Sequence, residues 1–375
     1  MISPRQFYDA FRYAGVEFFA GVPDSLLKDF CAYVADHAPE KAHVIAANEG
    51  SAVALATGYH LATGGVPLVY LQNSGLGNLT NPLLSLADDD VYGIPMVLLI
   101  GWRGEPGVPD EPQHIKQGEV TLGLLECMGI PYSVFDAAES APETLVAQAV
   151  SAARDSGSPY ALVARKGSFA PYKAAARRET VFGWTREAVI GHIADAVAPD
   201  DIVVVTTGMA SREMFEYRRA RGSGHEQDFL VVGGMGHASQ IALGIALQKP
   251  DRKVICIDGD GATLMHMGSM ATNGQFSPGN LRHIIVNNGA HDSVGGQPTA
   301  GFDVSLVGVA RACGYKYSES CSAADELEAC LRQLLQSDGP SLLEVKVDRG
   351  SRSDLGRPTT TPAENKRLFM DFVQS

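Results

Sequence analysis

Short apolar runs rich in β-forming residues recur along this chain and alternate with stretches long enough for helices. The runs predict strands at His43–Ala47, Val66–Leu71, Pro95–Ile100, Ala161–Ala164, Ile202–Thr206, Phe229–Val232, Lys253–Ile257, His283–Val286 and Leu342–Val347. Because these runs are apolar throughout, both faces of each strand are expected to be covered, as in parallel sheets. We therefore predict an α/β fold of doubly wound parallel sheets.

The two halves of the chain repeat one local pattern. Ser156–Ala164 and Ser337–Val345 each predict a turn that leads from a helix into a strand, and their prolines, Pro159 and Pro340, are 181 residues apart. A chain of 375 residues is also long enough for two domains. The sequence therefore predicts two similar domains, with no room for a third between them.

A polar and basic stretch without clear periodicity separates the two halves and contains Pro171. Such a composition is typical of a connecting segment. We predict a first domain at 1–166, a linker at 167–183 and a second domain at 184–375.

The chain is acidic, with 30 lysines and arginines against 43 aspartates and glutamates and a formal net charge of −13. This charge argues against binding to nucleic acid or to an anionic membrane. Charged residues occur in the first thirty positions, so we expect no apolar core of a signal peptide there. Apolar runs such as Met96–Ile100 are too short to span a membrane. The six cysteines form no zinc or disulfide pattern, so we expect a cytoplasmic protein.

The motif most specific to a chemical role lies in the second half. Two successive predicted strands lead into Asp260 and into Asn287, which are 27 residues apart. Open α/β sheets bind ligands at the carboxyl ends of such strands. A carboxylate and an amide oxygen suit Mg²⁺, and Gly259 and Gly261 would let the backbone approach a phosphate. Asp-Gly alone is also a common turn, but the following Asn-Asn-Gly favours metal binding.

These motifs and their spacing resemble the diphosphate- and magnesium-binding motif of thiamine diphosphate (ThDP) enzymes. The resemblance implies ThDP and Mg²⁺ as cofactors. It also implies a metal held by Asp260, Asn287 and the Gly289 carbonyl, and a diphosphate held by Gly259, Gly261 and Ala262.

ThDP enzymes also need a glutamate that exchanges a proton with the aminopyrimidine ring. The predicted strand His43–Ala47 leads to Glu49 and then to a helix rich in small residues, as in the family's strand–Glu–helix element. The resemblance makes Glu49 the activating glutamate. A simple acidic residue at a helix start is the alternative.

Three further loops match parts of the family's cofactor site. In the run Val232–His237, the resemblance implies that the Gly233 carbonyl accepts from the 4′-amino group and that Met235 bends the cofactor. A buried core methionine is the alternative for Met235. Gly208 is assigned to the diphosphate, and Asn73 is also assigned to the cofactor.

Longer stretches resemble the decarboxylases of this family, and most specifically the phosphonopyruvate decarboxylases. They are Gly21–Ser25, Gln72–Asn78, Trp102–His114, Asn287–Thr299 and Asp354–Thr359. The resemblance implies the conversion of 3-phosphonopyruvate to phosphonoacetaldehyde and CO₂, in phosphonate biosynthesis of the kind that yields antibiotics. Sulfopyruvate decarboxylase, a carboligating ThDP enzyme and a catalytically silent phosphate-binding protein are the alternatives.

The resemblance assigns the proton relay to Asp24 and His114. The first motif reads Pro-Asp-Ser rather than Pro-Gly-Asp, and a single histidine replaces the paired histidines of some relatives. A helix cap for Asp24 and an ordinary loop position for His114 are the alternatives. Residues expected to bind the small anionic 2-oxo acid are Asp24, Ser25, Arg103, His114, Lys116, His291, Ser293 and Arg357.

The family's architecture also carries an expectation about assembly. Glu49 and Asp260 must hold opposite ends of one cofactor, and in ThDP enzymes the two ends are generally held by different subunits. We therefore expect a homodimer or a higher homo-oligomer whose active sites lie at the subunit interface.

Overall fold

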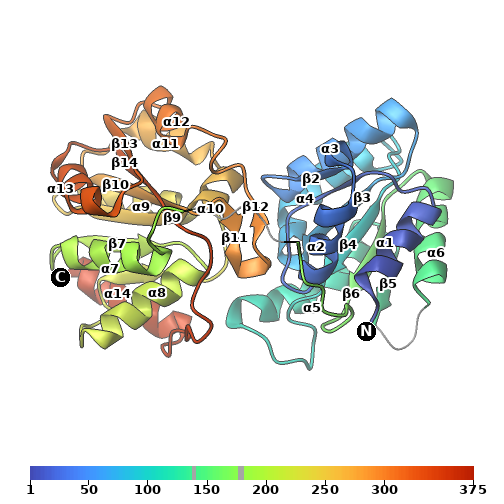
Figure 1. The fold of residues 1–375 in the computed structure, drawn as a ribbon, viewed down its shortest axis with the longest axis horizontal. Coiled ribbons are helices and arrows are strands. Elements are labelled where there is room, and N and C mark those ends of the chain that lie inside the picture. The colour runs from blue at the N-terminus through green and yellow to red at the C-terminus, as the bar shows by residue number, and fades with distance from the viewer. Residues whose placement is uncertain (137–140, 176–180) are drawn as a thin grey trace. The chain divides into compact units, whose positions relative to one another are not determined.

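The computed structural model describes residues 1–136, 141–175 and 181–375. The chain divides into two compact units, Met1–Arg177 and Arg178–Ser375, and each contains a sheet with helices on both of its faces (Figure 1). The boundary between the units falls within the segment 167–183, in which we predicted the linker.

The first unit is built on a parallel sheet of six strands in the order β2-β1-β3-β4-β6-β5. The strands are β1 (Phe19–Gly21), β2 (His43–Ile45), β3 (Leu68–Gln72), β4 (Val97–Gly101), β5 (Tyr132–Phe135) and β6 (Tyr160–Ala164). The helices are α1 (Pro4–Tyr13), α2 (Lys28–His37), α3 (Glu49–Thr63), α4 (Leu76–Pro82), α5 (Pro112–Cys127) and α6 (Pro142–Ser156).

Alternate residues of these strands enter two separate apolar layers, because successive side chains of a strand point to opposite faces. Leu68 and Tyr70 of β3 pack with Phe7 of α1 and Phe30 of α2 on one face. On the other face, Val69 and Leu71 pack with residues of α3 and α4. The strands are therefore apolar on both sides, which is why their sequences read as continuous apolar runs.

The second unit is built on a parallel sheet of six strands in the order β13-β14-β10-β9-β7-β8. The strands are β7 (Ile202–Val205), β8 (Asp228–Leu230), β9 (Val254–Gly259), β10 (Leu281–Asn287), β13 (Tyr317–Cys321) and β14 (Ser341–Lys346). A short antiparallel pair joins β11 (Ala290–His291) and β12 (Gln297–Pro298).

The longer helices of the second unit are α7 (Arg186–Ala196), α8 (Met209–Ala220), α9 (Ala238–Gln248), α11 (Ser269–Phe276), α13 (Leu327–Gln336) and α14 (Pro362–Gln374). Two shorter helices are α10 (Asp260–Met265) and α12 (Leu306–Ala312). Residues of α7, α8 and α13 cover one face of the sheet, and residues of α9, α11, α12 and α14 cover the other.

The two sheets have the same strand order. Numbered along each unit, both read second, first, third, fourth, sixth and fifth. The repeated turn-and-strand pattern falls on β6 and β14, the sixth strand of each unit. The prediction of two similar doubly wound domains is therefore confirmed at the level of topology.

The predicted linker is partly folded onto the first unit. Phe169 is buried against Phe7 and Phe30. The backbone amide of Tyr172 donates to Oδ1 of Asp29 at 2.9 Å. Residues up to at least Tyr172 therefore pack on the first unit, because an aromatic side chain in this basic stretch enters the core.

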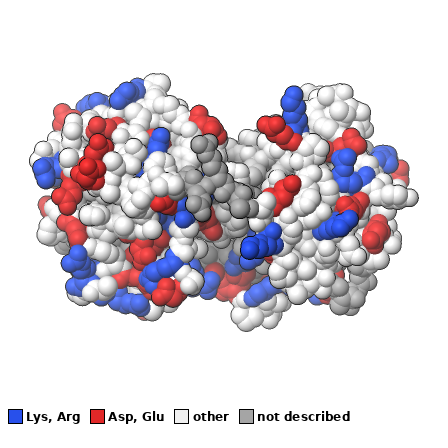
Figure 2. Space-filling view, viewed as in Figure 1, with Lys and Arg blue, Asp and Glu red and all other residues white. Residues whose placement is uncertain are grey.

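Charged side chains lie over the surface of both units (Figure 2). On the face that Figure 2 shows, basic and acidic side chains are interspersed over both units. No helix within the described ranges combines the length and the apolar character needed to cross a bilayer.

Candidate functional site

The carboxyl edge of the second sheet carries the residues predicted to hold the diphosphate and the metal. Asp260 follows β9 directly as the first residue of α10, and Asn287 is the last residue of β10. Both side chains are buried. Since β9 and β10 are hydrogen-bonded neighbours, the two residues lie at one place on this edge.

Two side-chain oxygens, Oδ2 of Asp260 and Oδ1 of Asn287, converge on a gap that exists because residue 301 is glycine. A Cβ atom on Gly301 would lie 2.6 Å from each of them. The Asn287 amide nitrogen donates to the Gly301 carbonyl and to Oε1 of Glu344, both at 2.7 Å, and so turns Oδ1 toward the gap. The Thr299 hydroxyl donates to Oδ2 of Asp260.

The residues around this gap fit a divalent cation. Burial raises the pKa of Asp260 to about 6, and hydrogen bonds from Thr299 and from backbone amides offset this effect only in part. A buried carboxylate is costly unless a cation compensates its charge. A carboxylate oxygen and an amide oxygen are the hard donors that Mg²⁺ prefers.

The third predicted metal ligand, the Gly289 carbonyl, has partners within the unit. It accepts from the backbone amide of Thr299 at 3.1 Å and from Nη2 of Arg349 at 3.2 Å. Gly289 has φ +62°, and a Cβ atom there would lie 2.4 Å from the Phe302 ring. Only glycine fits this turn, and metal binding by its carbonyl stays a prediction.

His291 and Ser293, predicted to bind the substrate, lie beside glycines predicted to bind the cofactor. The His291 imidazole is 3.0 Å from the position of a Cβ atom on Gly261, and Oγ of Ser293 is 2.9 Å from that on Gly208. Burial lowers the pKa of His291 to about 4 despite the nearby Asp292, so the imidazole is neutral at pH 7. A substrate role for these two residues stays a prediction.

The turn between β8 and α9 contains Gly233 and Met235. Gly233 and Gly236 have φ values of +73° and +85°, which favour glycine. The Gly233 amide donates to the Thr207 hydroxyl at 3.0 Å and so joins this turn to the one that follows β7. Met235 is only half-buried, so it is not a core methionine within its own unit.

Glu49 lies at the carboxyl edge of the first sheet as the first residue of α3 and is buried. Asn78 donates to Oε2 of Glu49 at 2.7 Å, and Gly75 leaves room for the carboxyl because a Cβ atom there would lie 2.4 Å from Oε1. Burial raises the pKa of Glu49, although the hydrogen bond from Asn78 lowers it. The carboxyl therefore keeps its proton to a higher pH than an exposed glutamate would, which suits proton exchange.

Asp24 follows β1 and is completely buried. Its Oδ2 accepts from the backbone amides of Leu26 and Leu27 at 2.9 and 3.2 Å, so it caps the turn before α2. Its Oδ1 is buried with no hydrogen-bond partner. Burial raises the pKa of Asp24 to about 6, although these amides and the Arg103 charge lower it. The N-cap residue of α2 is Leu27, so Asp24 holds the turn before the helix rather than the helix start that we weighed for it. This arrangement leaves Oδ1 of Asp24 for another task.

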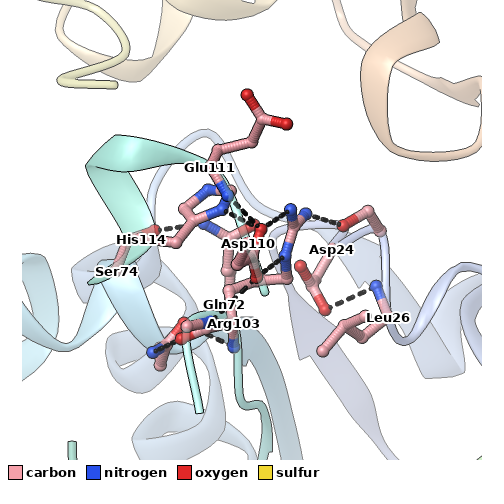
Figure 3. A network of polar contacts seen from close by, with 11 residues as sticks. Asp24, Leu26, Gln72, Ser74, Arg103, Asp110, Glu111 and His114 are labelled. Carbon is pink, nitrogen blue, oxygen red and sulfur yellow. Dashed lines mark hydrogen bonds and ion pairs between the residues drawn. The ribbon is translucent and has the colours of Figure 1, made fainter. Parts of the chain in front are cut away.

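A polar network near Asp24 contains three more of the predicted residues (Figure 3). Nη1 of Arg103 donates to the Ser25 hydroxyl at 2.6 Å, and its Nε donates to Oδ2 of Asp110 at 2.8 Å. Nδ1 of His114 lies 2.9 Å from Oδ1 of Asp110. The structure thus places Ser25, Arg103 and His114 in one network near Asp24, with Asp110 as the common partner of Arg103 and His114.

Asn73 is buried between the loop after β4 and helix α5. Its Nδ2 donates to the Arg103 carbonyl at 2.8 Å and to the Thr121 hydroxyl at 2.9 Å, and its Oδ1 accepts from the Arg103 amide at 3.2 Å. This side chain therefore fixes the Arg103 loop. Its predicted contact with the cofactor stays a prediction.

Two of the predicted substrate residues are exposed. Lys116 is exposed and forms an ion pair with Glu119, one turn along α5. Arg357 is exposed in the segment between β14 and α14.

The sequence analysis gave no role to Asn78, Asp110, Thr299 or Gly301. The first three lie within stretches that we had matched to decarboxylases, and the spacing of four between Asp110 and His114 places both on one side of a helix start. Gly301 carries no comparable signal, because its importance depends on two oxygens that the fold brings together.

Comparisons with known proteins match both units to one family. Residues 4–122 match the thiamine pyrophosphate enzyme N-terminal TPP binding domain, and residues 206–345 match the corresponding C-terminal TPP binding domain. Phosphonopyruvate decarboxylase of Streptomyces viridochromogenes is 37% identical over 96% of this chain and 92% of its own. Sulfopyruvate decarboxylase of Methanosarcina acetivorans is 27% identical over 94% of this chain and 93% of its own.

A solved structure, benzoylformate decarboxylase from Polynucleobacter necessarius, aligns with 94% of this chain and with all of its own. The identity is 14% and the TM-score is 0.40.

Proposed function

Because the chain belongs to the thiamine pyrophosphate enzymes, as a ThDP-dependent decarboxylase, we propose that its substrate is 3-phosphonopyruvate. The products are phosphonoacetaldehyde and CO₂. The observation that carries this proposal is the 37% identity to a phosphonopyruvate decarboxylase over almost the whole of both chains. The proposal extends to Mg²⁺ as the metal, to a cytoplasmic location and to a role in phosphonate biosynthesis.

Asp260 and Asn287 provide the metal site in this proposal. Their convergent oxygens would hold the Mg²⁺ ion together with the Gly289 carbonyl, and the ion would supply positive charge for the diphosphate. Backbone groups of Gly208, Gly259, Gly261 and Ala262 would hold the diphosphate. His291 and Ser293, next to Gly261 and Gly208, are placed to donate to it.

Glu49 provides the proton that activates the cofactor. ThDP, when bound, supplies the electron sink for decarboxylation. Burial favours the neutral form of the Glu49 carboxyl, so this group can give a proton to a ring nitrogen and take it back. The Gly233 carbonyl and the Met235 side chain orient the aminopyrimidine and the bend of the cofactor.

The overall reaction breaks the bond to the carboxylate carbon, releases CO₂ and adds one proton to the carbon that remains. Asp24 and His114 are the groups that hold and deliver this proton, because both are buried and both lie in one polar network. Arg103, joined to Ser25 in the same network, is the cation that binds the phosphonate.

Sulfopyruvate is the second candidate substrate, because a sulfopyruvate decarboxylase matches the chain over a similar length. A sulfonate carries one negative charge, whereas a phosphonate carries up to two. The two substrates would therefore use the same cofactor residues and differ in their dependence on Arg103.

The proposed function is tested by measuring CO₂ release from phosphonopyruvate, sulfopyruvate and pyruvate, each with and without ThDP and Mg²⁺. We expect the highest kcat/KM with phosphonopyruvate and little release when either cofactor is withheld. A higher kcat/KM with sulfopyruvate would overturn the substrate assignment, and full activity after removal of Mg²⁺ would overturn the metal assignment.

A further inference from the structure

Asp110 accepts more hydrogen bonds than any other residue of the polar network near Asp24. It lies just before α5, and its Oδ2 accepts from Nε of Arg103 and from the Gly104 amide, both at 2.8 Å. Its Oδ1 accepts from Nη2 of Arg103, from the Glu111 amide at 2.7 Å and from the His114 ring. The carboxylate is therefore surrounded by donors.

These donors determine the charge of Asp110. Burial raises its pKa, but the hydrogen bonds from Arg103 and His114 and from the two backbone amides outweigh burial and hold the pKa well below its usual range. Asp110 is therefore ionised and can only accept hydrogen bonds.

An ionised Asp110 determines which nitrogen of His114 carries hydrogen. Because the carboxylate only accepts, Nδ1 of His114 must be the donor across the 2.9 Å contact. Burial lowers the pKa of His114 despite Asp110, so the ring is neutral at pH 7. A neutral ring with hydrogen on Nδ1 has its lone pair on Nε2, where it can accept a proton.

Asp110 also fixes the Arg103 side chain. The two-point contact with Nε and Nη2 holds the guanidinium plane, and this leaves Nη1 against the Ser25 hydroxyl. Asn73 holds the backbone of the same arginine. Arg103 is thus fixed both at its guanidinium and at its backbone, just after the carboxyl end of β4.

We propose that Asp110 is a positioning residue that keeps hydrogen on Nδ1 of His114 and holds Arg103 against Ser25, so that one carboxylate orients both the proton-transfer group and the anion-binding group. This proposal rests on the proposed function for the roles of His114 and Arg103. The orientation itself is a property of the folded chain and can be measured without turnover.

The first test measures the ring hydrogens of His114 directly. In protein labelled with ¹⁵N-histidine, the His114 signals are assigned by their loss in His114→Gln, and the tautomer is taken from the two ring-nitrogen shifts near pH 7. We expect hydrogen on Nδ1 in the wild-type protein and a shift toward Nε2 in Asp110→Ala. Hydrogen on Nε2 in the wild-type protein would overturn the proposal, whether or not the variant folds.

The second test separates positioning from a merely structural role. We expect Asp110→Asn to lower kcat by roughly 10- to 100-fold, the usual cost of losing a group that orients a functional histidine, and to raise KM as Arg103 is released. Asp110→Glu should restore part of the lost kcat and should reverse part of the increase in KM. Glu119→Gln is the matched control, since Glu119 lies on α5 and pairs only with the exposed Lys116 in the contacts shown.

The outcomes distinguish this inference from the proposed function. If the wild-type protein has hydrogen on Nδ1 but decarboxylates none of the three acids, the proposed function fails and the positioning role of Asp110 stands. If the protein is active and Asp110→Asn leaves kcat and KM at the values of Glu119→Gln, the positioning role fails and the proposed function stands.

Discussion

At the scale of single residues, the Asp24 carboxyl both holds a turn and, when ionised, destabilises the folded chain. One carboxyl oxygen caps a turn, and the other is buried without a partner. Burial raises the pKa of Asp24 from 3.8 to about 6. The folded chain therefore holds this proton more tightly than the unfolded chain does, and its stability must fall as the pH rises from about 4 to about 6.

We predict that Asp24→Asn stabilises the protein at neutral pH and lowers its activity. The neutral amide removes the cost of a buried charge, which is about 3 kcal/mol above pH 6 and vanishes near pH 4. Asparagine cannot supply a proton, so kcat should fall. Urea unfolding between pH 4 and pH 8 measures the first effect, with the exposed Asp9→Asn as control. A variant no more stable than the wild type at pH 8 would contradict this account.

Gly301 gives a second prediction at this scale. The Cβ methyl group of an alanine at this position would lie 2.6 Å from Oδ2 of Asp260 and from Oδ1 of Asn287, too close for either oxygen to stay in place. We expect Gly301→Ala to weaken Mg²⁺-dependent ThDP binding at least about tenfold, because two hard donors must move apart. Calorimetry measures the affinity. Gly244→Ala on α9, where a Cβ atom meets nothing within 4 Å, should bind as the wild type does.

Site residues that directly follow a strand were easier to predict from the sequence than site residues whose position depends on loop packing. Asp260 and Asn287 could be placed because a strand end precedes or contains each of them, and parallel strands bring their carboxyl ends together. The proximity of Gly301 and Thr299 to Asp260 depends on the path of the loop after β12, which no periodic pattern encodes. The partners of Asp110 depend likewise on how one loop packs on α5.

At the scale of elements, the structure confirms a strand at each of the nine predicted apolar runs, and it contains further strands that we did not predict. Of these, β1 has only three residues, Phe19–Gly21, although it lies between β2 and β3. The edge strands β5 and β13 carry polar residues, such as Ser133 and Glu319. Short strands and polar edge strands give weak apolar signals, which is why they were missed.

The contact between α5 and the loop after β4 gives a prediction at this scale. A Cβ atom on Gly118 would lie 1.6 Å from the Gly104 carbonyl oxygen, and Trp102 donates to the Gly118 carbonyl at 3.0 Å. We expect Gly118→Ala to push the Arg103 loop off α5, to cost about 1–3 kcal/mol of stability and to lower kcat. Thermal unfolding and turnover measure both effects.

Gly123→Ala is the matched control for that change, because Gly123 lies on the same helix and a Cβ atom there meets nothing within 4 Å. Alanine favours helix over glycine, so the control should be at least as stable as the wild type. Equal stability and turnover in both variants would mean that the close approach of α5 to the loop is not required.

At the scale of the whole molecule, Glu49 and Asp260 lie in different units, and each unit has its own sheet and core. We predict an assembly of at least two copies in which Glu49 of one chain and Asp260 of its partner serve one cofactor. Glu49→Gln and Asp260→Ala chains should each be inactive alone. After mixing, dissociation and reassembly, about a quarter of the sites should be intact in random dimers.

Turnover of the reassembled mixture measures that recovery, and light scattering measures the size of the assembly. A fully active monomer would contradict the shared site, and so would no recovery after proven exchange of subunits. A mixture of the wild type with Glu49→Gln chains, treated in the same way, controls for activity lost during reassembly.

The identical strand order of the two sheets is what the tandem duplication of one ancestral gene would leave. Asn73 directly follows the third strand of the first unit, and Asp260 directly follows the third strand of the second. In the first unit this position holds an amide that ties a loop to a helix, and in the second it holds a carboxylate beside a second oxygen. Divergence after such a duplication would have kept the strands and their order, and it would have changed the residues at their carboxyl ends.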